Sequence, residues 1–116
     1  TMKPEYEAMI RSVGLKSGWS VLDAGCGGGS FLPLLAELVG SRGHISAIDL
    51  APENIERVET LVENSQLPCA VDTRVGNLTS LPYEDDRFDA VWCANITQYL
   101  TNDELSQMFA EFRRVV

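Results

Sequence analysis

The sequence lacks any long apolar run and any cluster of basic residues. No apolar stretch approaches the roughly 20 residues that a membrane-spanning helix needs, and the start shows no signal-peptide pattern, so we expect no membrane partner. Nine Lys and Arg stand against 17 Asp and Glu, for a formal net charge of -8. The basic residues are scattered, whereas binding to nucleic-acid phosphates requires them clustered. We therefore expect no nucleic-acid partner.

Cysteine and histidine are also scarce. Cys26, Cys69 and Cys93 are widely spaced and form no C-x-x-C pair, so we expect neither a disulfide framework nor a zinc site, and a cytoplasmic location is favoured. The single histidine, His44, is expected at the surface or edge of the fold rather than in a catalytic role. A chain of 116 residues with 45% apolar content predicts one domain with a substantial core.

A glycine loop is the most informative stretch that the sequence does contain. An apolar run ends at Asp23, glycines follow at 25, 27, 28 and 29, and residues 31–39 have the pattern of an apolar helix, which Ser30 is expected to cap. A strand that turns through glycines into a helix brings free backbone N–H groups and a helix N-terminus together. The pattern therefore predicts a site for a nucleotide-type cofactor.

The identity of that cofactor is narrowed by two residues. The dinucleotide fingerprint G-x-G-x-x-G would need its third glycine at position 30, which is Ser30. Asp23 would repel a bound pyrophosphate but attract a ligand that carries an amine and a sulfonium. On these residues, the stretch 21–29 resembles the first motif of the class I S-adenosylmethionine-dependent methyltransferases. The stretch 81–91, LPYEDDRFDAV, resembles the loop and fourth strand of the small-molecule enzymes of the ubiquinone-biosynthesis type.

The remaining pattern agrees with an α/β fold. Strands are predicted at 20–24, 44–49, 70–75 and 89–94, and helices at 31–39, at 52–64 and after Thr101. These elements predict a Rossmann-like, doubly wound parallel sheet with strand order 3-2-1-4 and right-handed crossovers. Residues 1–116 would form one domain, in which residues 1–18 supply a cap helix over 4–13 and a turn at 16–18. The family fold continues with a fifth strand and an antiparallel hairpin, so we expect the domain to be C-terminally incomplete.

The last helix has a clear beginning and one apolar face. Thr101 and Glu104 have the spacing of a capping box. Behind them, an apolar stripe is expected in the core; it comprises Leu105, Met108, Phe109 and Phe112.

The resemblance implies S-adenosylmethionine as the cofactor. The implied cofactor-binding residues are Asp23, Gly25, Cys26, Gly27, Gly29, Asp49, Leu50, Asn77, Leu78 and Asn95. The glycine loop would hold the methionine end, with Asp23 on its amino group. Asp49, 20 residues after Gly29, would accept hydrogen bonds from both ribose hydroxyls.

The adenine would lie against Leu50, Asn77 and Leu78, and Asn95 would carry the chain toward the acceptor. Asn77 stands where the family pattern has Asp, and an Asn oxygen can still accept from the adenine amino group. Two structural roles remain open as alternatives: Asp49 as an N-cap of the next helix, and Asn77 as a turn asparagine. No residue has the pairing that would identify a general base.

The implied reaction is transfer of a methyl group to a small-molecule acceptor. A non-catalytic cofactor-binding or interaction module is an alternative, as is an aminopropyl-transferase-like enzyme of the same fold. An NAD-type oxidoreductase is disfavoured by Asp23 and Ser30.

Overall fold

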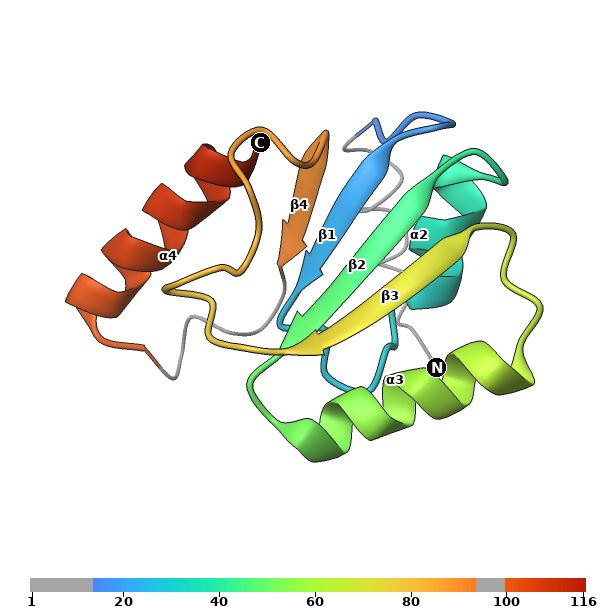
Figure 1. Ribbon diagram of the computed structural model, residues 1–116, viewed down its shortest axis with the longest axis horizontal. Helices are drawn as coiled ribbons and strands as arrows, with labels where there is room; N and C mark the ends of the chain where they lie inside the picture. Colours follow the sequence, from blue (N-terminus) through green and yellow to red (C-terminus); the bar gives the residue numbers. More distant parts are fainter. Residues whose placement is uncertain (1–13, 94–99) are drawn as a thin grey trace.

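The computed structural model describes residues 14–93 and 100–116, which form one parallel sheet with helices on both faces. The strands are β1 (Ser20–Ala24), β2 (His44–Asp49), β3 (Ala70–Val75) and β4 (Ala90–Cys93). The helices are α2 (Leu32–Val39), α3 (Pro52–Asn64) and α4 (Asn102–Val115). The strands lie in the order β3-β2-β1-β4 (Figure 1), which confirms the predicted α/β fold and strand order.

The core is divided by the sheet into two layers. On one face, α2 and α3 pack against strand residues such as Val21 and Ile45. On the other face, the segment 78–88 and α4 cover Leu22 and Ile48. Strands buried on both faces need continuous apolar sequence, which is why β1 and β2 are nearly uninterrupted runs of small and apolar residues.

The first three strands have the predicted bounds. The fourth begins one residue later than predicted, because Asp89 pairs with Ser20 outside the ladder: Oδ2 of Asp89 accepts from the Ser20 N–H at 2.8 Å, and the Asp89 N–H donates to the Ser20 carbonyl at 2.7 Å. The predicted turn at 16–18 is present, and Gly18 donates to the carbonyl of Val39 at 2.7 Å. The helix predicted over 4–13, and Ala94 in the predicted fourth strand, lie outside the described residues.

The predicted cap of α2 is wrong. The N-cap is Phe31 rather than Ser30, and no side-chain hydrogen bond caps the helix. Gly29 donates to the Cys26 carbonyl at 3.0 Å and Leu32 donates to the Gly29 carbonyl at 3.1 Å. These two successive turns extend the glycine loop by one residue, and the helix therefore begins at Leu32.

Helix α4 begins where it was predicted to begin, but not all residues of its predicted apolar stripe are buried. Both hydrogen bonds of the capping box between Thr101 and Glu104 are present. Met108 is fully buried, whereas Phe109 is 46% exposed, so its predicted place in the core is wrong. The helix covers only one edge of the sheet, and the side chain one position beyond Met108 turns away from the contact.

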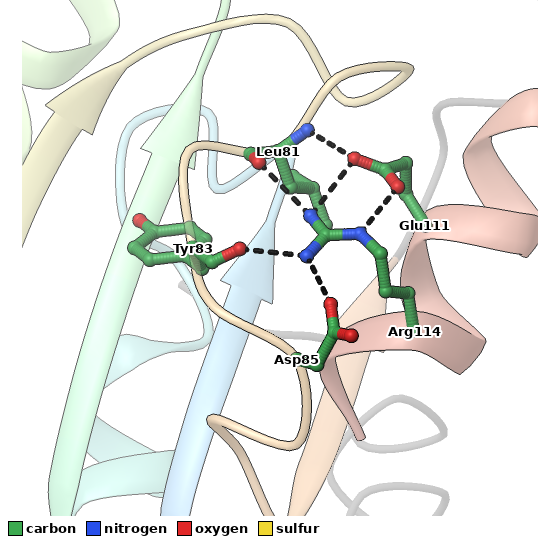
Figure 2. Close-up of polar contacts among 5 residues, drawn as sticks. All are labelled: Leu81, Tyr83, Asp85, Glu111 and Arg114. Atoms are coloured by element: carbon green, nitrogen blue, oxygen red, sulfur yellow. Dashed lines mark hydrogen bonds and ion pairs between the residues drawn. The ribbon is translucent and has the colours of Figure 1, made fainter.

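A polar cluster ties α4 to the segment that precedes β4 (Figure 2). Arg114 donates to both carboxylate oxygens of Glu111, at 2.7 and 3.0 Å, and to the carbonyls of Leu81 and Tyr83 and a carboxylate oxygen of Asp85, at 2.8 to 3.0 Å. Glu111 in turn accepts from the Leu81 N–H at 2.7 Å. These bonds fix the path of the chain between β3 and β4.

The helices in the described part of the chain are all too short or too polar to span a membrane.

Candidate functional site

The glycine loop is fixed to the end of the neighbouring strand. The N–H groups of Gly25 and Cys26 both donate to the carbonyl of Ile48 in β2, at 2.8 and 3.1 Å. Gly25, Gly27 and Gly29 have φ values of 69°, 57° and 87°, a region that glycine adopts without the cost of a Cβ. The loop therefore has one defined conformation that the alternating glycines permit.

Two of these glycines serve different needs. A Cβ on Gly29 would lie 3.1 Å from Leu61 and 3.3 Å from Val58, so this glycine lets α3 approach the loop. A Cβ on Gly27 would meet nothing within 4 Å. Within the described chain, no hydrogen bond uses the N–H of Gly27 or Gly28. The loop thus presents open space and available donors, as an approaching ligand requires.

Asp23 is buried at the end of β1 beside this loop. Its side chain is 1% exposed, and Oδ2 has no hydrogen-bond partner. Burial, and secondarily the nearby Asp49 carboxylate, raises the pKa of Asp23 from its ordinary value of 3.8 to about 7. A buried carboxylate without a partner is costly, and a ligand cation would remove that cost.

A second buried polar atom without a partner lies on the adjacent strand. Nε1 of Trp92 in β4 makes no hydrogen bond, and the residue is 9% exposed. Trp92 pairs in register with Asp23. Its ring packs edge-on against Phe31, with centroids 5.5 Å apart. From the sequence alone, Trp92 was given no individual role in the site; a tryptophan in an otherwise small and aliphatic strand was the signal that could have identified it.

Asp49 ends β2 and is held by α3. Nδ2 of Asn54 donates to Oδ2 of Asp49 at 2.7 Å. The N-cap of α3 is Ala51, with no side-chain capping bond, so the alternative role of Asp49 as an N-cap is wrong. The following residue, Leu50, is 68% exposed. A carboxylate and an exposed apolar side chain therefore stand together at the end of this strand.

Asn77 and Leu78 follow β3. Oδ1 of Asn77 accepts from the N–H and the hydroxyl of Thr79, at 2.9 and 2.8 Å, which confirms the turn role that the sequence left open. Leu78 is 5% exposed and packs on the α4 face of the sheet. The adenine contacts of both residues stay predictions, and the Asn77 oxygen is already engaged by Thr79.

The cysteines near the loop are poor nucleophiles. Burial, with the Asp23 and Asp49 carboxylates as smaller causes, raises the pKa of Cys26 to about 12. Burial and Asp23 raise the pKa of Cys93 to about 11. Both thiols stay protonated at neutral pH. Cys26 therefore contributes to this site as a small apolar side chain.

His44 lies at the opposite edge of the sheet, where β2 begins. Its Nε2 is 3.6 Å from Oδ1 of Asp72, at the surface. The expectation of a peripheral histidine is confirmed. Asn95 lies outside the described residues. No group of His, Cys, Asp and Glu within 14–93 and 100–116 could hold a metal ion.

The parallel strands bring the predicted residues to one edge of the sheet. The glycine loop follows β1, Asp49 ends β2 and Asn77 comes after β3, and these adjacent strands point the same way in Figure 1. Ligands of open parallel sheets bind at this edge. With Asp23 and Asp49 as its charged groups, the edge suits a ligand that carries a cation and hydroxyl groups.

Three comparisons place this arrangement among known proteins. A family described as "Methyltransferase domain" matches residues 21–116. The demethylmenaquinone methyltransferase of Bacillus subtilis is 30% identical over 111 residues, covering 92% of this chain and 45% of that protein. The ubiquinone biosynthesis O-methyltransferase of Methylocella silvestris is 39% identical over 83 residues, covering 72% of this chain and 30% of that protein.

A solved methyltransferase structure also matches this chain. The crystal structure of a SAM-dependent methyltransferase from Aquifex aeolicus superposes with a TM-score of 0.84 at 29% identity, and the match covers 95% of this chain and 57% of that one. The chain thus spans about half the length of these relatives, or less.

Proposed function

Because this chain belongs to the class I S-adenosylmethionine-dependent methyltransferase family, we propose that it binds S-adenosylmethionine at the carboxyl edge of its sheet and transfers a methyl group to a small-molecule acceptor. The observation that carries the proposal is the buried Asp23 carboxylate, whose Oδ2 has no partner and which lies beside a glycine loop with available N–H donors.

The residues at this edge fit the cofactor. Asp23 binds the ammonium of the amino-acid end, since a buried carboxylate is stabilised most by a cation. The open space at Gly27 admits the same end of the ligand without a clash. Asp49, oriented by Asn54, accepts hydrogen bonds from the ribose hydroxyls. Leu50 offers an exposed apolar side chain to the adenine, and Leu78, which follows β3, is the second apolar residue proposed to contact it.

The chemistry in this proposal is mainly positioning. S-adenosylmethionine supplies, when bound, a methyl group on a sulfonium that leaves as a neutral thioether. The chain holds the two ends of the ligand on separate strands, with Asp23 on β1 and Asp49 on β2, and the loop between them is fixed to Ile48. Such a rigid frame lowers the entropic part of the barrier for a bimolecular displacement. The described residues supply no general base in this scheme.

Calorimetric titration tests the cofactor assignment. The protein is titrated with S-adenosylhomocysteine, and with NAD as the control. Binding of the first ligand alone is expected, and Asp23→Asn is expected to weaken it by roughly tenfold or more, since a charge-assisted hydrogen bond is lost. Binding of NAD alone, or unchanged affinity in the Asp23 variant, would contradict the assignment.

The acceptor class is proposed from the relatives. One of them is named as a demethylmenaquinone methyltransferase and another as an O-methyltransferase of ubiquinone biosynthesis. We therefore expect methyl transfer from labelled S-adenosylmethionine to a small aromatic alcohol or quinol. Tight cofactor binding without transfer to any member of such a panel would favour a non-catalytic cofactor-binding module.

A further inference from the structure

Two buried polar atoms at the loop need partners of opposite kinds. Oδ2 of Asp23 can only accept when the carboxylate is ionised, and Nε1–H of Trp92 can only donate. Neither atom has a hydrogen-bond partner, and both residues are buried, Asp23 with 1% and Trp92 with 9% of its surface exposed. Leaving a polar group buried and unpaired costs roughly 1–3 kcal/mol. A ligand group that paired with both atoms would remove both costs.

The two side chains lie in the same part of the molecule. Asp23 and Trp92 are register partners on the adjacent strands β1 and β4, so their side chains leave the same face of the sheet. The indole contacts Phe31, which directly precedes α2 and follows the glycine loop. Trp92 and Cys26 of the loop belong to one buried cluster. Asp23 thus lies just before the loop in the chain, and Trp92 reaches its other end through Phe31.

A single small ligand group can satisfy an acceptor and a donor together if it carries both a cation and an anion. The amino-acid end of S-adenosylmethionine is such a zwitterion. We propose that Trp92 is a cofactor-binding residue whose indole N–H donates a hydrogen bond to the ligand carboxylate while Asp23 accepts from the ligand ammonium. The inference rests on the proposed function and adds a residue that selects for an intact amino-acid end.

Two ligands separate this role from packing. S-adenosylhomocysteine has the amino-acid end, and 5′-methylthioadenosine keeps the adenine, ribose and thioether but lacks it. Trp92→Phe retains an aromatic ring against Phe31 and removes the N–H. Trp19→Phe, at the half-buried tryptophan that precedes β1, is the matched control. Calorimetry on wild type and both variants gives six affinities, and circular dichroism checks the fold of each variant.

Trp92→Phe is expected to weaken S-adenosylhomocysteine by roughly tenfold or more and to leave 5′-methylthioadenosine unchanged. Trp19→Phe is expected to change neither. If Trp92→Phe loses affinity equally for both ligands, or for neither, the indole N–H does not bind the ligand carboxylate. A water that bridged the Trp92 N–H and Asp23 in place of the ligand would give that second result. Failure of wild-type protein to bind S-adenosylhomocysteine would instead overturn the proposed function, and this inference with it.

A second measurement does not depend on the stability of Trp92→Phe. The chain has two tryptophans, so its ¹⁵N spectrum has two indole N–H signals, and Trp19→Phe assigns them. The Trp92 indole proton is expected to move downfield with S-adenosylhomocysteine and to stay in place with 5′-methylthioadenosine. An identical spectrum with both ligands contradicts the proposal.

Discussion

The amide of Asn54 donates a hydrogen bond of 2.7 Å to Oδ2 of Asp49 and so joins the first turn of α3 to the end of β2. Asp49 is half-buried, and a carboxylate accepts several hydrogen bonds, so the group is oriented without being saturated. Helix α3, which packs on β2 and β3, therefore sets the direction of the carboxylate proposed to bind ribose.

Asn54→Ala is expected to weaken binding of S-adenosylhomocysteine by roughly three- to tenfold, because one hydrogen bond that orients Asp49 is lost. Asn64→Ala, at the other end of α3, is the matched control and should bind as wild type. Calorimetry of both variants measures the difference. Equal affinities in the two variants would show that Asp49 needs no such support.

The stability of the ligand-free protein is expected to depend on pH through Asp23. Its pKa is about 7 in the folded state, against 3.8 ordinarily. The native state therefore binds more protons than the unfolded state between these values, and the free energy of unfolding falls as the pH rises from about 4 to about 7, then levels off. Each pKa unit corresponds to about 1.4 kcal/mol, so the loss is of order 4 kcal/mol.

Urea unfolding at several pH values measures this dependence. Asp23→Asn should remove most of it and should be more stable than wild type at pH 8, whereas the exposed Glu63→Gln should follow wild type. Parallel curves for wild type and Asp23→Asn would mean that the carboxyl group is solvated in solution.

Alanine at the two loop glycines should separate folding from binding. Gly29→Ala combines a φ of 87° with contacts of 3.1 and 3.3 Å to α3, and should lower the free energy of unfolding by about 2–4 kcal/mol. Gly27→Ala has only the conformational cost, about 1–2 kcal/mol, but its methyl group enters the open space of the site. Gly29→Ala should therefore lower the thermal unfolding temperature more than Gly27→Ala does. Gly27→Ala should weaken the binding of S-adenosylhomocysteine more than Gly29→Ala does. The reverse order would contradict the geometry.

Removing the Arg114 guanidinium should release the segment 81–85. Arg114→Ala loses all of the hydrogen bonds drawn from that side chain in Figure 2, whereas the neighbouring Arg113→Ala leaves them in place. Hydrogen exchange of the Leu81 amide, which is bonded to Glu111, should accelerate roughly tenfold or more in the first variant only. Similar exchange in both variants would show that Glu111 holds the segment unaided.

The sheet could be predicted because a local sequence pattern marks each strand. An apolar run that ends in an acid predicted β1, and alternating apolar residues predicted β2 and β3, all three with their observed bounds. The succession of strand and helix patterns predicted the order β3-β2-β1-β4. The capping box of α4 was predictable for the same reason, since its two partners are three residues apart.

Features that depend on distant contacts were not predictable. Arg114 meets Leu81, Tyr83 and Asp85 across about 30 residues of chain, and no local pattern marks that pairing. The exposure of Phe109 depends on how far α4 overlaps the sheet. Trp92 was overlooked because an aromatic residue in a strand is ordinarily core, and only the tertiary structure reveals its unpaired N–H.

The strand order also has a consequence for how the chain is assembled. β1 is central and pairs with β2 and with β4, yet it precedes β4 by more than 60 residues, and no two of the four strands form a hairpin. Parallel pairing of this kind closes long loops and is intrinsically slow. During synthesis, β1 can acquire β2 early, but its other edge stays open until Cys93 has emerged. Until that point the apolar edge of β1 can pair with other chains. The folding yield should therefore depend on how fast the segment from β3 to β4 is synthesised.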